Sequence, residues 1–113
     1  MEFKKQKPIY LQIADTLCER IVAHVWEPDE RLASVRDVAE ELGVNPNTVM
    51  RTFDFLQTNG IIYNRRGVGY FVSPDAVKRI LKMQRKYFFE EEWPVVRQRM
   101  QMLGISFDEL KEM

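Results

Sequence analysis

The chain has 113 residues, of which 45% are hydrophobic and 30% charged, with 17 Lys and Arg balancing 17 Asp and Glu. This length and composition predict a soluble globular chain, either one compact domain of ordinary size or one small domain plus an appendage, and they exclude a disordered or fibrous protein. The single cysteine and the single histidine exclude an intrachain disulfide and offer no metal-ligand spacing.

The charge distribution gives no general reason to expect a nucleic-acid partner. Residues 1–75 hold nine Lys and Arg against eleven Asp and Glu, so any DNA binding must depend on where individual charges lie. No apolar run approaches the roughly 20 residues that span a bilayer, and the N-terminus lacks the apolar segment of a secretory signal. We therefore expect a cytoplasmic protein with no membrane partner.

The first predicted element is an amphipathic helix over residues 9–25. Its apolar residues Ile13, Leu17 and Ile21 recur at every fourth position. The sequence around Pro28 ends this helix, and a short extended piece is expected at residues 31 and 32.

Two further helices follow, separated by a tight turn. Ser34 starts the first of them and Gly43 ends it. Asn45 is expected to cap the next helix, and Pro46 suits its first position, where the missing N–H costs nothing. Helix, glycine turn and capped helix form the pattern of a helix-turn-helix.

The outward face of the third helix is mostly short and polar, with one long cation. It is expected to carry Asn47, Thr48, Met50, Arg51 and Asp54. The free backbone N–H groups at the start of this helix suit an anionic partner.

A change of period after Gly60 predicts a β-hairpin. The sequence IIYNRRGVGYFV has two β-rich arms around a glycine tip. Arg65 and Arg66 beside this turn make a loop that can approach a phosphate-lined groove.

The rest of the chain predicts a helical tail. A long helix begins near Val77, Pro94 kinks or restarts it, and Ser106 with Glu109 forms the capping box of a last short helix. This tail is too apolar to be fully exposed to solvent and too short to form a domain alone, so pairing with a second copy of the chain is expected. The predicted dimerisation residues are Ile80, Leu81, Tyr87, Phe88, Val96, Met100 and Leu103.

The segments PIYLQIADTLCERIV and LASVRDVAEELGVNPNTVMRTFDFLQTNGIIYNRRGVGYFV carry a family resemblance. Their P-I-Y-x-Q-I, L-x-S-x-R, N-P-N-T-V and R-x-G-x-G-x-F-V motifs, in this order, resemble the winged helix-turn-helix domain of the GntR family of bacterial transcription regulators. The short tail is similar to the helical appendage of the YtrA-like subfamily.

The resemblance implies a mainly α fold with a small β-hairpin wing, formed by a DNA-binding domain at residues 1–74 and a helical dimerisation tail at residues 75–113. It also implies contact with double-stranded DNA at positions from both helices and from the wing. These positions are Ser34, Arg36, Asn45, Asn47, Thr48, Arg51, Arg66, Gly67 and Gly69.

The loop after the first helix departs from the family pattern G-x-L-x-P-G-x-x-L-P-S. In this sequence His24, Trp26, Asp29 and Ala33 stand at family positions for glycine, leucine, glycine and proline. Asp29 tolerates the left-handed turn that a glycine would favour, so we expect the loop to keep its conformation despite these differences.

Two functions of different class fit these residues. The first is a sequence-specific DNA-binding transcription regulator, a repressor that binds an inverted-repeat operator as a dimer. The other is a winged-helix module for protein–protein assembly, which zero net charge would favour. The cations Arg36, Arg51 and Arg66 favour the first, because an assembly module has no need for them at these places.

An enzyme is not expected, because no nucleophile–base pair, metal cluster or phosphate loop is visible. No cofactor is expected, and a small-molecule effector stays open.

Overall fold

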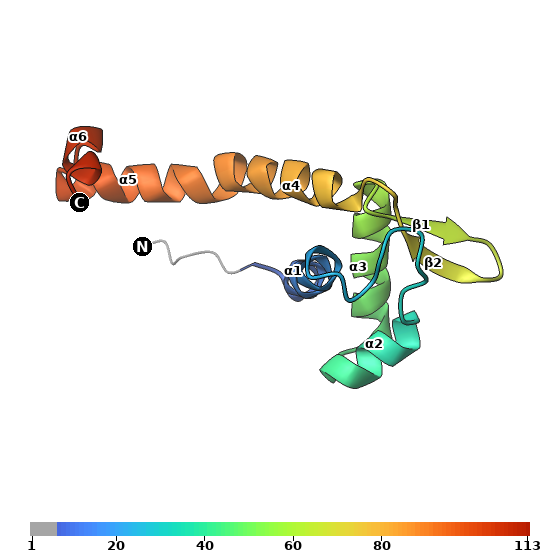
Figure 1. The fold of residues 1–113 in the computed structure, drawn as a ribbon. Coiled ribbons are helices and arrows are strands. Elements are labelled where there is room, and N and C mark those ends of the chain that lie inside the picture. The colour runs from blue at the N-terminus through green and yellow to red at the C-terminus, as the bar shows by residue number, and fades with distance from the viewer. Residues whose placement is uncertain (1–6) are drawn as a thin grey trace. The chain divides into compact units, whose positions relative to one another are not determined.

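The computed structural model describes residues 7–113, which fall into two compact units divided after Ile80. The first unit contains three helices and a hairpin (Figure 1). Its elements are α1 (Ile9–Val22), α2 (Val35–Leu42), α3 (Pro46–Thr58), β1 (Ile62–Arg65) and β2 (Gly69–Val72). The elements that follow are α4 (Ala76–Tyr87), the π-helix η1 (Phe88–Glu92), α5 (Trp93–Leu103) and α6 (Phe107–Lys111). The prediction of a mainly α fold with a small hairpin is confirmed.

The ends of α2 and α3 follow the predicted capping residues. The Ser34 hydroxyl accepts a hydrogen bond from the Asp37 N–H at 3.1 Å, and Gly43 is the C-cap of α2. Asn45 caps α3, with Pro46 in its first turn. These local interactions satisfy backbone groups that a helix end leaves without a partner, so the helix boundaries are set by short-range chemistry.

Helix α3 is central to the core of the first unit. Its side chains Val49, Phe53 and Leu56 are fully buried. Helices α1 and α2 both contact α3, and α1 contributes the buried Leu17 and Cys18. Burial raises the pKa of the Cys18 thiol to about 12, so this cysteine is a neutral core side chain at physiological pH.

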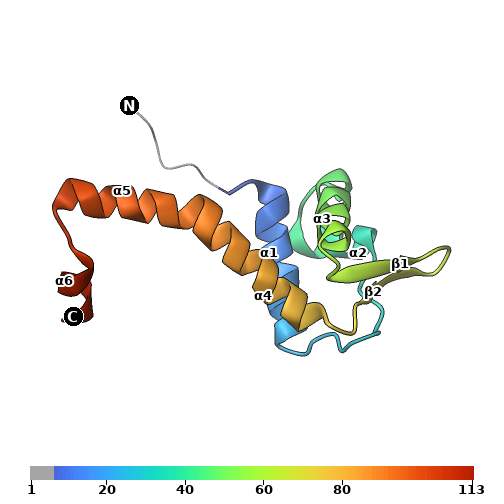
Figure 2. The same cartoon turned by 90° about the horizontal axis from the view of Figure 1, so that it is seen from above.

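The hairpin β1–β2 is antiparallel, with Ile62 opposite Val72 and Arg65 opposite Gly69. In both views it projects beyond the three helices (Figures 1 and 2). The predicted extended piece lies along β2: the Leu32 N–H donates to the Tyr70 carbonyl at 2.8 Å. A single β-bridge also joins residues 31 and 71. The loop after α1 is therefore tied to the wing by backbone hydrogen bonds.

Two residues of that loop adopt the left-handed conformation at positions where the family pattern has glycine. His24 has φ 62° and Asp29 has φ 64°, so the expectation that Asp29 tolerates this turn is confirmed. Asp29 also has a specific contact, because the Tyr63 hydroxyl donates to its carboxylate at 2.8 Å. This hydrogen bond raises the pKa of Tyr63. The His24 imidazole Nδ1 lies 3.3 Å from a carboxylate oxygen of Glu27, and both of these side chains are exposed.

We expect His24→Gly to raise the free energy of unfolding by about 0.5–1 kcal/mol, because glycine adopts this conformation without the penalty of a Cβ. Thermal unfolding at neutral pH measures the change. Asp29→Gly is the matched control: it relieves the same backbone penalty but removes the hydrogen bond from Tyr63, so it is expected to gain less or to lose stability. An equal gain in both variants would contradict this account of Asp29.

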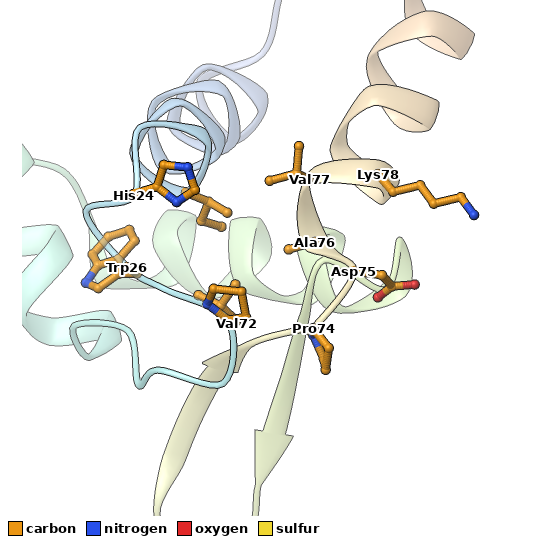
Figure 3. A pocket seen from close by; sticks show the side chains of 10 residues that line it. His24, Trp26, Val72, Pro74, Asp75, Ala76, Val77 and Lys78 are labelled. Atoms are coloured by element: carbon orange, nitrogen blue, oxygen red, sulfur yellow. The ribbon is translucent and has the colours of Figure 1, made fainter.

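The same loop borders a pocket in the first unit with a volume of about 250 Å³ (Figure 3). Its lining includes Trp26, Val72 and Val77. The side chains of Asp75 and Lys78 point away from it (Figure 3). Most of the pocket lining is therefore apolar, and His24 is a polar side chain in it.

The boundary between the units differs from the predicted one. We predicted a break between residues 74 and 75, whereas the compact units divide after Ile80. The reason is that the start of α4 is buried at Ala76 and Ile80. This first part of α4 is therefore part of the core of the first unit.

The second unit is a run of helices. The helical path restarts near Pro94 as predicted: η1 ends at Glu92, and Pro94 lies in the first turn of α5, where a missing N–H is tolerated. The predicted cap of the last helix is also present, because the Ser106 hydroxyl accepts a hydrogen bond from the Glu109 N–H. Helix α6 stacks on α5 through Phe107 and Trp93, whose ring centroids are 5.9 Å apart.

Candidate nucleic-acid interface

The N-terminus of α3 presents polar groups of two kinds. The Asn45 carboxamide oxygen accepts a hydrogen bond from the Asn47 N–H at 2.7 Å, so Asn45 serves mainly to hold the helix end. Asn47 is exposed and Thr48 is half-buried. Among residues 7–113 the Asn47 side chain has no hydrogen-bond partner, so its amide is free to reach another molecule.

The start of α2 supplies the next candidates. The Ser34 hydroxyl is used in its cap, and Arg36 is exposed in the first turn. No carboxylate in the described part of the chain pairs with Arg36. Arg36 is thus a cation beside a helix N-terminus, an arrangement that suits a phosphate.

Arg51 lies on the exposed side of α3 and stacks on an aromatic ring of α1. Its guanidinium carbon is 3.9 Å from the centroid of the Tyr10 ring. Within residues 7–113 no acidic side chain forms an ion pair with Arg51. The N–H groups of Arg51 therefore stay available for a ligand.

The wing carries its cations at a glycine turn. The Val68 N–H donates to the Arg65 carbonyl at 2.8 Å and closes the turn. Arg65 also stacks on Phe71, at 5.1 Å from the ring centroid. Arg66 and Gly67 are exposed, and Arg66 has no ion-pair partner in the described residues. Arg66 is therefore the wing cation with the greatest freedom to reach a phosphate.

The two wing positions 67 and 69 require glycine for different structural reasons. Gly67 has φ +77° with open space where a Cβ would lie, so only its backbone conformation requires glycine. Gly69 has φ +145°, and a Cβ there would lie 2.8 Å from Nε of Arg31. The side chain of Arg31 thus crosses the wing at Gly69.

Sequence reasoning missed Arg31 and Tyr10. Arg31 reaches the wing only through the β-bridge with Phe71, and Tyr10 reaches Arg51 only through the packing of α1 on α3. Each of these pairs is separated by about 40 residues, so no local spacing rule could have revealed them.

The predicted dimerisation residues divide into exposed and buried ones. Leu81, Phe88, Val96 and Leu103 are exposed and Tyr87 is half-buried. Ile80 and Met100 are 1% and 8% exposed. These two side chains have almost no exposed surface for contact with a partner, so they are removed from the predicted dimerisation residues.

The second unit also exposes apolar side chains that were not among the predicted dimerisation residues. Together with the four exposed dimerisation residues, they are called the apolar tail residues. Their exposed fractions range from 43% to 77%. They are Leu81, Phe88, Phe89, Val95, Val96, Met102, Leu103, Phe107 and Leu110.

Within the described residues no group of three or more His, Cys, Asp or Glu could hold a metal ion. In the same part of the chain, no helix is both long and apolar enough to cross a membrane. The candidate interface consists of the exposed polar start of α3, the start of α2 and the cationic wing.

Three helices with a capped polar recognition helix, followed by a two-stranded wing with a cationic tip, define a winged helix-turn-helix DNA-binding domain. Residues 9–72 match the family model described as bacterial regulatory proteins, gntR family. The chain therefore belongs to the gntR family of transcription regulators, as its motifs predicted.

The chain is similar to regulators of comparable length. It is 38% identical over 111 residues to the HTH-type transcriptional regulator YhcF of Bacillus subtilis, covering 98% of this chain and 90% of YhcF. A solved GntR-family transcriptional regulator from Bacteroides thetaiotaomicron is 40% identical, with a TM-score of 0.79 over 94% of this chain and 92% of that one.

Two further relatives are informative about the DNA-binding part. The HTH-type transcriptional repressor YtrA of Bacillus subtilis is 36% identical over 73 residues, covering 65% of this chain and 56% of YtrA. The DNA-binding domain of AraR, solved in complex with operator ORX1, shares the fold at 24% identity, with a TM-score of 0.58 over 60% of this chain and 82% of that one.

Proposed function

We propose that the protein is a repressor that binds an inverted-repeat operator as a homodimer. Helix α3 enters the major groove, and the wing lies along the sugar–phosphate backbone. The observation that carries this proposal is the exposed polar surface at the start of α3, where Asn47 and Arg51 have no acidic partner in the described chain. Amide and guanidinium groups are the side chains best suited to read base edges.

The other proposed contacts divide by their chemistry. Arg36 and Arg66 are cations without specific partners and suit phosphate oxygens, which position the protein on the duplex. Ser34, Asn45 and Thr48 lie at helix N-termini, where backbone N–H groups favour anions. Gly67 and Gly69 let the wing approach closely. DNA contact at each of these positions is part of the proposal.

The proposed dimer is supported by the apolar tail residues. Among the described residues beyond position 80, Met100 is the only buried hydrophobic side chain. This unit therefore has little hydrophobic core of its own. Exposed apolar surface of this kind is typical of a protein–protein interface. A second copy is the proposed partner because two DNA-binding units joined by such an interface would match a two-fold repeat in DNA.

The repressive direction follows from where such a dimer would act. YtrA, which is 36% identical to this chain over 73 residues, is named a repressor, and a dimer that occupies a promoter can block transcription there. Bacterial chromosomes lie in the cytoplasm, and we propose that the protein acts there.

Selection of duplexes from a random library with the intact chain, followed by gel-shift assays, tests the proposal. The expected result is an enriched motif of two half-sites in inverted repeat, bound at least 10³-fold more tightly than an unrelated duplex. Failure to enrich any motif would support the alternative of a winged-helix module for protein assembly. Transcription from a promoter carrying the enriched motif then distinguishes repression from activation.

Arg66→Ala is expected to weaken binding to the enriched duplex and to an unrelated duplex alike, because a phosphate contact carries no sequence information. The slope of log K against log salt should fall by about one unit for each protomer. Titrations by fluorescence anisotropy at several salt concentrations measure it. Lys82→Ala, an exposed cation on the tail, serves as the control and should leave the slope unchanged. An unaltered slope in Arg66→Ala would count against the role of the wing.

A further inference from the structure

We propose that Tyr10 is a positioning residue for DNA recognition: its ring holds the guanidinium of Arg51 in place for contact with a base. The inference rests on the proposed function, in which Arg51 lies in the major groove. Tyr10 itself is on α1, outside the helix-turn-helix motif.

The geometry of the pair is that of a close cation–π contact. The guanidinium carbon of Arg51 is 3.9 Å from the centroid of the Tyr10 ring, well inside the distance of about 6 Å at which such contacts are effective. It is shorter than the other arginine–aromatic contacts of the described chain, which measure 5.1–5.8 Å.

Stacking leaves an arginine competent to bind, whereas an ion pair does not. A carboxylate partner would occupy the N–H donors that read guanine, while a ring contacts only the flat face of the guanidinium. A free arginine side chain loses rotamer entropy when it is immobilised. Holding Arg51 on Tyr10 before DNA arrives reduces that loss on binding.

Tyr10 is itself held firmly. Its ring meets Phe55 edge-to-face, with centroids 6.0 Å apart and an interplanar angle of 79°. Its carbonyl accepts a hydrogen bond of 2.7 Å from the hydroxyl of Thr52, which is fully buried. Phe55 lies four residues after Arg51 on α3, so both side chains share one helix face and the Tyr10 ring contacts both. The support under Arg51 is therefore a fixed ring.

Arg20 provides a contrast within the same unit. Its guanidinium lies 5.8 Å from the ring of Trp26, but both of its terminal nitrogens donate to the carboxylate of Glu41. Arg20 is thus a structural cation whose donors are already used. Trp26→Leu removes an aromatic residue near an arginine without touching a recognition residue, and it is the matched control.

The test measures binding of the full chain to the enriched duplex, to a duplex with one altered base pair, and to an unrelated duplex. Tyr10→Phe keeps the ring and is expected to bind like the parent chain. Tyr10→Leu is expected to reduce the preference for the enriched duplex about 3- to 30-fold. Binding to the unrelated duplex should change little, and Trp26→Leu should not change the preference.

Double substitution separates positioning from a general effect on the fold. In an Arg51→Ala background, Tyr10→Leu is expected to cause no further loss of preference, because the ring would then have nothing to position. Thermal unfolding is followed for every variant, and Tyr10→Met replaces Tyr10→Leu if the latter does not fold.

The outcomes are distinct. If Arg51→Ala leaves the preference unchanged, the proposed recognition role of Arg51 is wrong and the role of Tyr10 is wrong with it. If Arg51→Ala loses preference but Tyr10→Leu does not, or if the losses are additive, the proposed function stands and the positioning role alone is overturned. Equal losses in Tyr10→Phe and Tyr10→Leu would also overturn it.

Discussion

A chain carrying Val96→Glu and Leu103→Glu is expected to be monomeric at micromolar concentration and to bind an inverted repeat about 10²–10⁴-fold more weakly than the parent chain. Both side chains lie on α5 and are 46% and 59% exposed, so the substitutions do not disturb a protomer core. In the proposed dimer they would bury two carboxylates in apolar surface, which is strongly unfavourable. The loss in affinity follows because the second half-site would no longer be bound at high effective concentration.

Sedimentation velocity and fluorescence anisotropy measure the two effects on the same samples. The control is Gln98→Glu with Gln101→Glu, which adds the same charge at exposed polar positions of α5, pointing away from residues 96 and 103. It is expected to stay dimeric. A parent chain that sediments as a monomer, or a monomeric variant with full affinity for the inverted repeat, would rule out the dimer mechanism.

Arg51→Ala is expected to weaken binding to the enriched duplex by about 1–3 kcal/mol for each half-site and to relax the preference at one base-pair position. The reason is that its stacked guanidinium keeps N–H donors free of any ion pair within residues 7–113. Binding to an unrelated duplex should fall much less. Anisotropy titrations on a panel of single base-pair variants identify the position.

Arg99→Ala removes an exposed arginine from the tail and controls for a general loss of positive charge. A uniform loss in Arg51→Ala across all duplexes would make Arg51 a phosphate contact. Unchanged binding to every duplex would remove it from the interface.

Much of the DNA-binding unit could be predicted because its boundaries depend on short-range chemistry. Ser34 and Asn45 cap helices through hydrogen bonds that span three and two residues, and Gly67 and Gly69 mark the turn of the hairpin. The family motifs identified the fold for the same reason, since they consist largely of capping, turn and core residues at fixed spacings. The outward face of α3 followed from its buried residues, since a helix that buries Val49 and Phe53 on one side leaves Met50, Arg51 and Asp54 exposed on the other.

The tail was less predictable because amphipathic spacing does not say which side of a helix meets its own chain. Ile80 and Leu81 are neighbours with the same hydrophobicity, yet one is 1% exposed and the other 58%. The predicted division at residue 74 failed to coincide with the compact units for the same reason, because Ala76 and Ile80 extend the first core into α4.

By itself, the sequence determined the class of fold, the helix ends, the wing and the family, since these depend on residue type and local spacing. Only the tertiary structure decided which cations are paired and which are free. Arg20 is bound to Glu41, 21 residues away, whereas Arg51 rests on Tyr10 and Arg31 crosses the wing at Gly69. These contacts join elements far apart in the chain, and a long arginine side chain can reach any of several partners. Its environment is therefore set by the packing of α1 and the loop after it against α3 and the hairpin.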